Sequence, residues 1–371
     1  GRYYVTSKEK YSSSHILNKI SYNDKINPNS FKKIINKFNY LNIEKQINNF
    51  KKIKILIIGE VIIDHYIFCK ALGKSGKEPV LAMEETSDKK FLGGIGGIAN
   101  NLIEFTDDVT ILSMANKDSE EYNFINKKII KKIKKKFLHN KSLINIVKKR
   151  FVDDITKHKL LGVYKLNSKD NNNENAKTKN NVINYLNKNL NNYDIVLTVD
   201  YSHGLIDNKI ANLIVKKSKF LAVNCQLNSS NIAHHSISKY KKADLLLINE
   251  DELRNETREK EIEINMLFNK FIRENNFKSV LLTRGKNGAI FKSKKSKKIY
   301  EFPALTSFVV DKVGAGDSML PIATLSEYLN LDKNLILFLS SLSSFKAVQT
   351  LGTEKKNEKK DFLRNIEYLL K

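Results

Sequence analysis

Tryptophan is absent from the sequence, and cysteine and proline are scarce, with two and four residues respectively among 371. Cys69 and Cys225 lie outside any Cys-x-x-Cys or Cys/His cluster, so neither a disulfide framework nor a structural zinc site is indicated. No apolar run approaches the ~20 residues that span a bilayer, and the first residues lack the features of a secretory signal. We therefore expect a cytoplasmic protein with no membrane partner.

Acidic residues are in deficit, because 40 Asp and Glu stand against 65 Lys and Arg, which gives a formal net charge of +25. Clustered basic residues can neutralise phosphates, but these lysines are spread over the whole chain among Asn and Ile. No recognisable nucleic-acid module accompanies them, so we expect no nucleic-acid partner. In the densest run, residues 127–136, isoleucines stand three or four apart, which predicts a surface helix with one buried stripe.

Short apolar segments recur along the chain and predict the fold class. The first, residues 53–63, is a near-continuous run of β-branched side chains, the pattern of a strand buried on both faces of a parallel sheet. Similar segments follow at residues 109–113, 195–199, 220–223, 245–248 and 280–283. Several are separated by helical patterns, so we expect an α/β protein with a doubly wound, mostly parallel sheet flanked by helices.

Two stretches break this alternation, at about residues 66–85 and 150–166, and we expect them to form a small β lid beside the main sheet. The Asn- and Lys-rich segment 167–181 is typical of a mobile surface loop. Residues 21–51 read as a linker with one or two amphipathic helical stretches, so the compact domain is predicted to cover residues 52–371.

The segment 311–317, Asp-Lys-Val-Gly-Ala-Gly-Asp, precedes a predicted helix and has the character of an anion site. Amides at a helix N-terminus lack intrahelical partners, so Gly314, Ala315 and Gly316 can stabilise a transferring phosphoryl group. Asp317 could then accept the proton of the attacking hydroxyl as the catalytic base. Taken alone, the tetrapeptide is better explained as a tight turn in which Asp317 caps the helix.

Asn249 and Glu252 follow directly on the apolar segment 245–248, at the carboxyl end of a predicted strand where α/β folds bind ligands. They could orient Mg²⁺ through its waters. A capping box, in which Glu252 reaches back to the amide of Asn249, explains the spacing equally well.

The segment 283–288, Thr-Arg-Gly-Lys-Asn-Gly, follows another apolar strand, and its glycines permit close approach of the backbone to a nucleotide. A simple β-turn before a strand at residues 289–291 is the alternative.

Asp64 ends the first strand, and the glycine-rich segment 93–97 precedes a predicted helix over residues 98–105 that contains Asn101. A carboxylate and an amide among glycines suit a polyhydroxylated ligand. Residues 94–99 also satisfy the loose G-x-G-x-x-A dinucleotide pattern, but no long strand stands before them. A P-loop ending at residues 73–75 is excluded, because Phe68 occupies the position of its first glycine.

Taken together, these motifs resemble the ribokinase-like (PfkB) carbohydrate kinases over residues 52–371. Within that family the similarity is greatest to the heptose-7-phosphate kinase half of the bifunctional kinases and nucleotidyltransferases that make ADP-heptose. Residues 78–80 (Glu-Pro-Val) and 200–204 (Asp-Tyr-Ser-His-Gly) add to this likeness. Residues 11–18 (Tyr-Ser-Ser-Ser-His-Ile-Leu-Asn) resemble the closing motif of a cytidylyltransferase-type domain, so residues 1–20 are expected to be the remnant of an attached nucleotidyltransferase.

The resemblance implies ATP and Mg²⁺ as cofactors, phosphorylation of a sugar or sugar phosphate, and a homodimer. It also admits an activating monovalent cation near Gly352. It implies a catalytic role for Asp317 with Gly314, Ala315 and Gly316. It implies sugar contacts at Asp64, Gly93, Gly94, Asn101, Arg150 and Asp311, with Lys148 as a further basic position. It implies nucleotide contacts at Asn249, Glu252, Thr283, Gly285 and Gly288, with magnesium held through water by Asn249 and Glu252.

Four residues depart from the family pattern, and they concern the identity of the sugar more than the kinase chemistry. Gly97 stands where relatives carry an asparagine, His203 replaces a lysine, Glu60 replaces an aspartate, and Pro321 interrupts a helix of small residues. Two rival functions are a non-catalytic sugar- or nucleotide-binding module and an NAD-dependent oxidoreductase that uses residues 94–99.

Overall fold

The computed structural model describes residues 28–167, 173–227, 237–306, 309–352 and 358–371, so the expected nucleotidyltransferase remnant lies outside the described residues. The helices are α2 (Pro28–Ile35), α3 (Tyr40–Asn48), α4 (Gly94–Leu102), α5 (Glu120–Lys128), α6 (Asn173–Asn189), α7 (Asn208–Lys217), α8 (Glu250–Thr257), α9 (Ile264–Glu274), α10 (Ala315–Tyr328), α11 (Lys333–Ala347) and α12 (Lys359–Leu370). The strands are β1 (Lys54–Gly59), β2 (Val61–Lys74), β3 (Leu81–Gly93), β4 (Asp108–Ala115), β5 (Lys134–His139), β6 (Ile146–Asp153), β7 (Lys159–Lys165), β8 (Ile195–Asp200), β9 (Leu221–Cys225), β10 (Ala243–Asn249), β11 (Phe277–Thr283), β12 (Ala289–Ser293) and β13 (Tyr300–Phe302).

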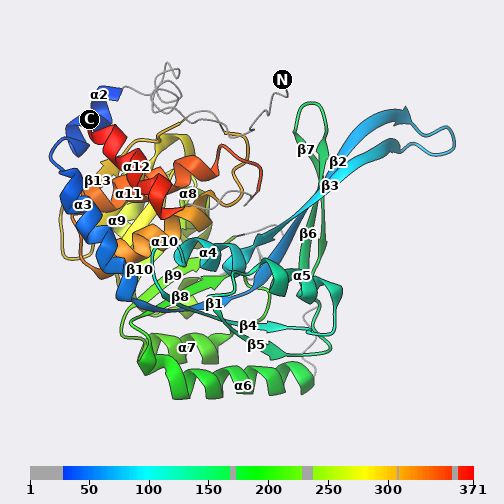
Figure 1. The fold of residues 1–371 in the computed structure, drawn as a ribbon, viewed down its shortest axis with the longest axis horizontal. Coiled ribbons are helices and arrows are strands. Elements are labelled where there is room, and N and C mark those ends of the chain that lie inside the picture. Colours follow the sequence, from blue (N-terminus) through cyan, green and yellow to red (C-terminus); the bar gives the residue numbers. More distant parts are fainter. Residues whose placement is uncertain (1–27, 168–172, 228–236, 307–308, 353–357) are drawn as a thin grey trace, which may run out of the picture.

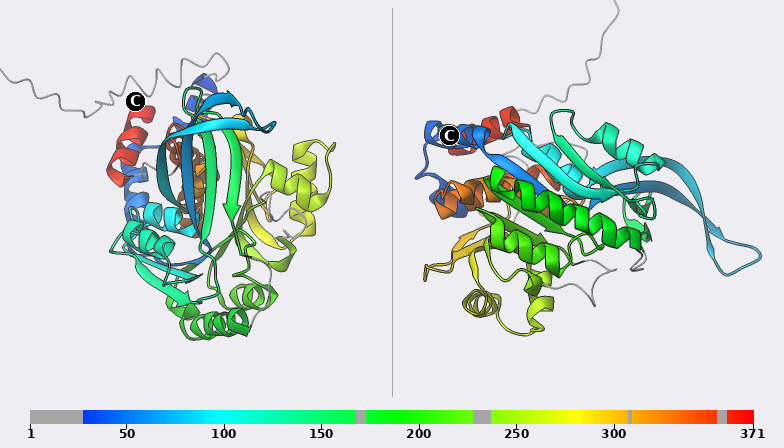
Figure 2. Two further views of the ribbon diagram at one scale, coloured as in Figure 1. Left: turned by 90° about the vertical axis from the view of Figure 1, so that its right-hand side faces the viewer. Right: turned by 90° about the horizontal axis from the view of Figure 1, so that it is seen from below.

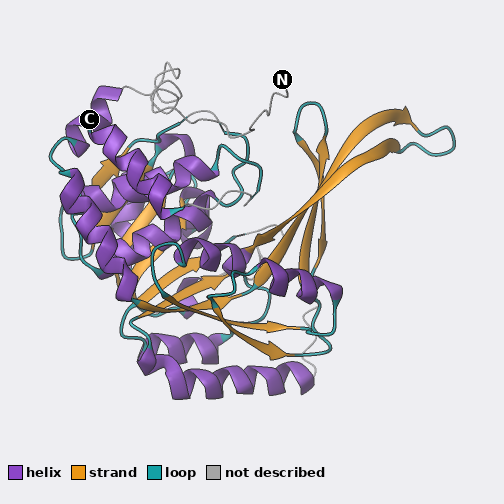
Figure 3. Ribbon diagram, viewed as in Figure 1, coloured by secondary structure: helices purple, strands orange, loops and turns teal. Residues whose placement is uncertain are grey.

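The main sheet has nine strands in the order β13-β12-β11-β10-β9-β8-β1-β4-β5, with helices on both faces (Figure 3). The strands from β11 to β5 are parallel, and β12 and β13 add an antiparallel edge. Along β1, Ile55 and Ile57 enter the core with α4, α10 and α11, whereas Leu56 and Ile58 enter the core with α6, α7 and α9. Burial on both faces explains the unbroken apolar run, and the predicted doubly wound sheet is confirmed.

A second sheet, in the order β3-β2-β6-β7, forms the lid, and the hairpin of β2 and β3 extends far from the body (Figures 1 and 2). The chain passes from β1 into β2 with only Glu60 between them, so the lid begins at Val61, earlier than the sequence predicts. Asp64 pairs in register with Lys148 on β6 and with Phe91 on β3. The lid therefore grows directly out of the carboxyl end of the first central strand.

Two local predictions are wrong. The helix expected over residues 127–136 ends at Lys128, and residues 134–139 form β5 instead, because pairing with β4 and burial of Phe137 outweigh the local helical spacing. The loop expected up to residue 181 gives way to α6 from Asn173, whose Thr178, Val182 and Leu186 form a buried stripe at helical spacing. The Asn- and Lys-rich composition hid this stripe.

Residues 28–50, expected to belong to a linker, pack into the core. Phe31 and Ile35 of α2, Ile43 and Ile47 of α3, and Phe50 all belong to the cluster that covers one face of the main sheet. These helices contact α11 and α12 respectively, so the compact body includes residues before the predicted boundary at residue 52. None of the helices in the described ranges is long and apolar enough to cross a membrane.

Candidate active site

The glycine-rich turn before α10 leaves the start of this helix open. Gly314 is the N-cap residue and adopts the left-handed region at φ 84°, where a side chain would be strained. A Cβ atom built on Gly316 would meet no atom within 4 Å, so the space in front of the first helical turn is free of protein atoms at that point. With the dipole of the helix behind it, the first turn of α10, which includes Ala315, suits an anionic group such as a phosphate.

Asp317 lies in this first turn, and its carboxylate is held by side chains from the neighbouring strands. Its Oδ1 accepts a hydrogen bond of 3.0 Å from Nε2 of Gln226 and a longer one of 3.5 Å from the hydroxyl of Tyr201. Burial, with the negative charge of Asp64 adding to it, raises the pKa of Asp317 to about 6. The N-cap residue of α10 is Gly314, which has no side chain to cap the helix, and the side-chain contacts of Asp317 are those with Gln226 and Tyr201.

Asp64 on β2 contributes the second carboxylate of the site and is buried against Arg150, with which it forms an ion pair. The neighbouring Lys148 is also buried, and its ammonium lies 5.8 Å from the ring centre of Tyr201 and 5.7 Å from that of Tyr164. Burial lowers the pKa of Lys148, and the charge of Asp64 opposes this effect. The charges of Asp64 and Lys148 both act on the pKa of Asp317, so the lid strands that carry them lie near the glycine-rich turn.

The glycine-rich segment that begins α4 lies tightly against these groups. A Cβ atom on Gly93 would lie 2.3 Å from Oδ2 of Asp64, and one on Gly94, which adopts φ 57°, would lie 2.4 Å from the carbonyl oxygen of Glu60. Asn101 lies in the last turn of α4, and α4 packs beside α10. The strand before α4 is the antiparallel lid strand β3, so the parallel βαβ unit of a dinucleotide site is absent around these described residues.

Asn249 and Glu252 form the capping box at the start of α8. Oδ1 of Asn249 accepts a hydrogen bond of 2.7 Å from the backbone amide of Glu252. In return, Oε2 of Glu252 accepts one of 2.9 Å from the backbone amide of Asn249. Oε1 of Glu252 accepts from the amide of Leu227 at 3.1 Å, and burial raises the pKa of this carboxyl to about 7. Among the described residues no group of three or more His, Cys, Asp and Glu is placed to hold a metal ion.

Residues 283–288 make the turn between β11 and β12, which Thr283 enters as the last residue of β11. Gly288 is confined by backbone, because a Cβ atom there would lie 2.1 Å from the carbonyl oxygen of Phe302. Gly285 is exposed at φ 54°, and a Cβ atom there would meet nothing within 4 Å. The open side of this turn fits a nucleotide, whereas Gly288 is required by the fold.

Asp311, for which a sugar contact is expected, lies between the lid and the turn before α10. Its carboxylate is buried and accepts hydrogen bonds from Tyr66 and Lys159 of the lid. Both oxygens thus accept hydrogen bonds from protein donors, which holds this carboxylate in place between the lid and the turn before α10.

Sequence reasoning missed the contribution of Gln226 and understated that of Glu60 and Tyr201. Glu60 accepts hydrogen bonds of 3.2 Å from the backbone amides of Tyr201 and Leu205, and burial raises the pKa of its carboxyl to about 7. Gln226 directly follows β9, as Tyr201 follows β8. Gln226 and Tyr201 could have been predicted from the sequence, because each directly follows an apolar segment that is expected to be a parallel strand.

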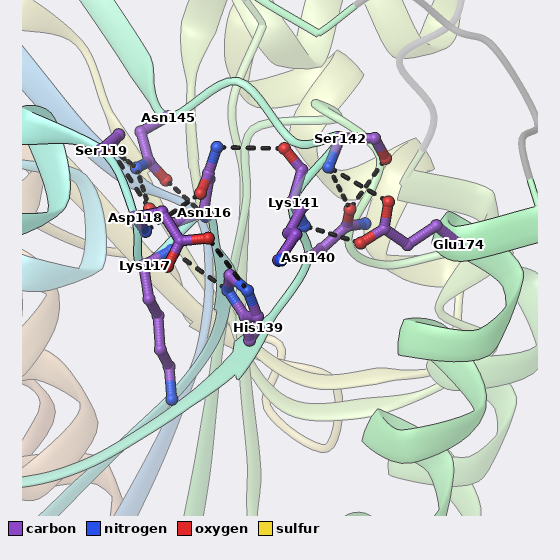
Figure 4. A network of polar contacts seen from close by, with 10 residues as sticks. All are labelled: Asn116, Lys117, Asp118, Ser119, His139, Asn140, Lys141, Ser142, Asn145 and Glu174. Atoms are coloured by element: carbon purple, nitrogen blue, oxygen red, sulfur yellow. Dashed lines mark hydrogen bonds and ion pairs between the residues drawn. The ribbon is translucent and has the colours of Figure 1, made fainter.

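A polar network holds the start of β6, the strand that carries Lys148 and Arg150 (Figure 4). The side-chain amide of Asn145 donates to the carbonyl of Asn116 at 2.8 Å and to the hydroxyl of Ser119 at 2.7 Å. Glu174 at the start of α6 accepts from the amides of residues 141 and 142. Asn145 also lines a cavity of about 20 Å³ with His203. The buried Nε2 of His203 has no hydrogen-bond partner within the part of the chain that the structure describes, and burial lowers the pKa of this imidazole to about 4.

Comparison with known proteins adds a family and relatives. Residues 52–321 match the pfkB family carbohydrate kinases. The bifunctional protein HldE of Helicobacter acinonychis is 27% identical over 279 residues, which cover 74% of this chain and 58% of that protein. HldE of Campylobacter curvus is 26% identical over 319 residues, which cover 83% of this chain and 64% of that protein. The chain therefore spans less than two thirds of the length of these bifunctional relatives.

Other matches extend over nearly the whole of shorter proteins. An uncharacterized sugar kinase of Buchnera aphidicola is 24% identical, and the match covers 84% of this chain and 96% of that protein. Arabidopsis thaliana ribokinase complexed with ribose and ATP superposes with a TM-score of 0.64 at 14% identity, covering 85% of this chain and 99% of the other. Escherichia coli phosphofructokinase-2 in complex with potassium gives a TM-score of 0.65 at 13% identity, and the match covers 86% of this chain and 100% of the other. These two likenesses establish the fold.

Proposed function

The chain belongs to the pfkB family of carbohydrate kinases, and on this premise we propose that it transfers the γ-phosphoryl group of ATP to a hydroxyl of a heptose phosphate. The observation that carries the proposal is the position of Asp317. A carboxylate whose pKa is raised to about 6 lies in the first turn of α10, near enough to Asp64 of the lid for the charge of Asp64 to contribute to that rise. A base, an anion site and a polar substrate surface therefore meet in one place.

Asp317 would act as the general base. Its carboxylate takes the proton of the sugar hydroxyl, and the hydroxyl oxygen bonds to the γ-phosphorus as the bond to the bridging oxygen of ADP breaks. The amides of Gly314, Ala315 and Gly316 would stabilise the negative charge of the group in transfer. Magnesium, when bound, supplies positive charge to the phosphates, and Asn249 and Glu252 would orient it through water.

The nucleotide would lie between the start of α10 and the turn of residues 283–288. Gly285 and Gly316 both border open space, which supports the approach of phosphates and of the nucleoside to backbone groups. Near Gly352, where a monovalent cation is expected, the amide of Gly352 and the ammonium of Lys159 both contact Asp311. The protein itself thus provides one positive charge at that place.

The sugar would lie under the lid. Asp64 and Asn101 can bond hydroxyl groups, and Gly93 and Gly94 allow close approach. The buried ammonium of Lys148 and the guanidinium of Arg150 support an anionic group on the substrate, as in a sugar phosphate. Relatives named as bifunctional HldE proteins support a heptose phosphate in particular.

The decisive experiment measures ADP release with a panel of a heptose 7-phosphate, the free heptose, glucose 6-phosphate and glucose, with Asp317→Asn as the matched inactive variant. We expect the heptose 7-phosphate to give the highest kcat/KM and the free sugars to be poorer substrates. ADP release by the wild type that does not exceed the enzyme-free background on any sugar would instead indicate a non-catalytic binding module.

The setting of this kinase is also a proposal. The lengths of the HldE relatives support an attached nucleotidyltransferase in the full protein, and the two buried, free cysteines suit a reducing cytoplasm. A homodimer formed through the lid is supported by exposed apolar side chains on it, namely Leu72, Leu81, Leu160, Leu161 and Val163. Sedimentation of the wild type and of Leu161→Lys would test the dimer.

A further inference from the structure

Four separate chain segments meet at the buried carboxylate of Asp311. Its Oδ1 accepts one hydrogen bond from Nζ of Lys159, at 2.7 Å, and another from the backbone amide of Val313, at 3.0 Å. Its Oδ2 accepts from the hydroxyl of Tyr66 at 2.5 Å and from the amide of Gly352 at 3.2 Å. Tyr66 and Lys159 belong to the lid strands β2 and β7, whereas Val313 precedes the N-cap residue of α10.

The two lid donors differ in freedom. Tyr66 is fully buried, and its ring packs edge-to-face on the ring of Phe91, with 5.4 Å between the ring centres. The hydroxyl of Tyr66 is therefore fixed relative to the lid. The side chain of Lys159 is 41% exposed and stands on the edge strand β7. Although burial alone would raise it, hydrogen bonds from Lys159 and Tyr66 hold the pKa of Asp311 below its ordinary value. An ionised carboxylate at this depth therefore depends on the lid for its stabilisation.

Tyr66 also faces the substrate side of the lid. It pairs in register with Arg150, and the guanidinium carbon of Arg150 lies 5.4 Å from the centre of the Tyr66 ring. Arg150 in turn pairs with Asp64. A continuous set of contacts thus runs from the expected sugar site through Arg150 and Tyr66 to Asp311, and from there to the turn that forms the anion site.

We propose that Tyr66 and Lys159 are positioning residues that couple the position of the lid to the shape of the turn before α10, with Asp311 as the shared acceptor. This inference rests on the proposed kinase function. In the arrangement that the structure holds, Lys159 and Tyr66 of the lid contact Asp311, which accepts from the amide of Val313 and so orients the turn for the γ-phosphate. When the lid moves away, Asp311 loses its charged partner and the turn loses its anchor.

The test compares Lys159→Met with two variants. Lys159→Arg keeps a cation, and Lys165→Met removes another exposed lysine of β7, whose ammonium pairs with Glu121 at 2.7 Å. Loss of a hydrogen bond to a charged group predicts a fall in kcat on a heptose 7-phosphate of about 10- to 100-fold in Lys159→Met. We expect the Kd of ATP to change less than about threefold, Lys159→Arg to recover most of the rate, and Lys165→Met to stay near wild type. Tyr66→Phe combined with Lys159→Met should be non-additive.

Hydrogen–deuterium exchange over residues 309–320 gives a second readout that does not require turnover. We expect faster exchange in Lys159→Met than in the wild type and no change in Lys165→Met. Unchanged kcat and exchange in Lys159→Met, or equal losses in Lys165→Met, would overturn the coupling while leaving the kinase function intact. An inactive wild type would count against the kinase function alone, because the exchange experiment still decides the coupling.

Discussion

Gln226 donates a hydrogen bond of 3.0 Å from its side-chain amide to the carboxylate of Asp317. Gln226 follows the central strand β9, and Asp317 lies in the first turn of α10, so this contact fixes the proposed base at the carboxyl edge of the main sheet. Tyr201, which follows the adjacent strand β8, bonds the same oxygen. The proposed base is therefore held by side chains that follow two adjacent strands of the main sheet.

Replacing Asp317 by Asn should abolish most of the phosphoryl transfer. Asn cannot accept the hydroxyl proton, so we expect kcat to fall by about 10²- to 10⁴-fold, the usual contribution of a general base. The Kd of ATP should stay near the wild-type value, because the backbone amides of the turn remain. Rapid-quench kinetics and calorimetric titration check the two quantities, with Asp251→Asn at an exposed position of α8 as the control. Turnover within tenfold of wild type would remove Asp317 as the base.

The pH dependence of the rate should reveal the same group. Because only the ionised carboxylate accepts a proton, kcat/KM should fall about tenfold per unit below the pKa of about 6 and level off above it. The positive charge of Lys148 lowers the pKa of Asp317, so Lys148→Met should move the midpoint upward. A profile that is flat from pH 5 to pH 8 in the wild type would contradict this assignment.

The raised pKa of Asp317 also predicts a trade between activity and stability. A carboxyl whose pKa is higher in the folded than in the unfolded state destabilises the folded state when it is ionised. For Asp317 this destabilisation is complete above the folded pKa of about 6, and it disappears below the unfolded pKa near 4. Asp317→Asn should therefore be more stable than wild type at pH 8, by on the order of 2 kcal/mol, with almost no difference near pH 3.5, below the unfolded pKa. Urea unfolding at the two pH values measures this. A variant less stable than wild type at pH 8 would mean that the carboxylate makes a net favourable contact.

The sequence predicted the central strands well because each is buried on both faces, and an unbroken β-branched run such as that of β1 admits few other structures. It predicted the turn before α10 because Gly314 must adopt positive φ. It failed at residues 127–136, where the pairing of β5 with β4 decides the structure and local periodicity does not. Non-local pairing of this kind leaves no trace in a short window of sequence.

The site residues show a similar division. Asp64 and Asp317 could be proposed from their motifs, but their mutual electrostatic effect depends on how the lid folds over the sheet. The capping box of Asn249 and Glu252 was one of two equal interpretations, and only coordinates reveal the reciprocal hydrogen bonds. Asp311 belongs to a recognisable motif, yet its partners Tyr66 and Lys159 lie far away in the sequence. Long-range contacts therefore account for most of what sequence reasoning could not supply.

Gly93→Ala should weaken sugar binding selectively. The new Cβ atom would stand 2.3 Å from Oδ2 of Asp64, so the carboxylate would have to leave its place beside Arg150. We expect the KM for the sugar to rise by tenfold or more, on the scale of about 1.4 kcal/mol per factor of ten, while the Kd of ATP is unchanged. Steady-state kinetics with each substrate varied in turn separates the two. A rise confined to the KM of ATP would place Asp64 outside the sugar site.

Gly316→Ala tests the opposite side of the site, because the Cβ atom points into open space rather than into the protein. Gly316 lies inside α10, where alanine is favoured over glycine by about 1 kcal/mol, so the folded state should gain stability. If this space receives the phosphates, the methyl group must obstruct them, and we expect the KM of ATP to rise while the KM of the sugar stays the same. Thermal unfolding and ATP titration give the two results. A variant that gains stability and keeps its affinity for ATP would show that the nucleotide approaches another part of the turn.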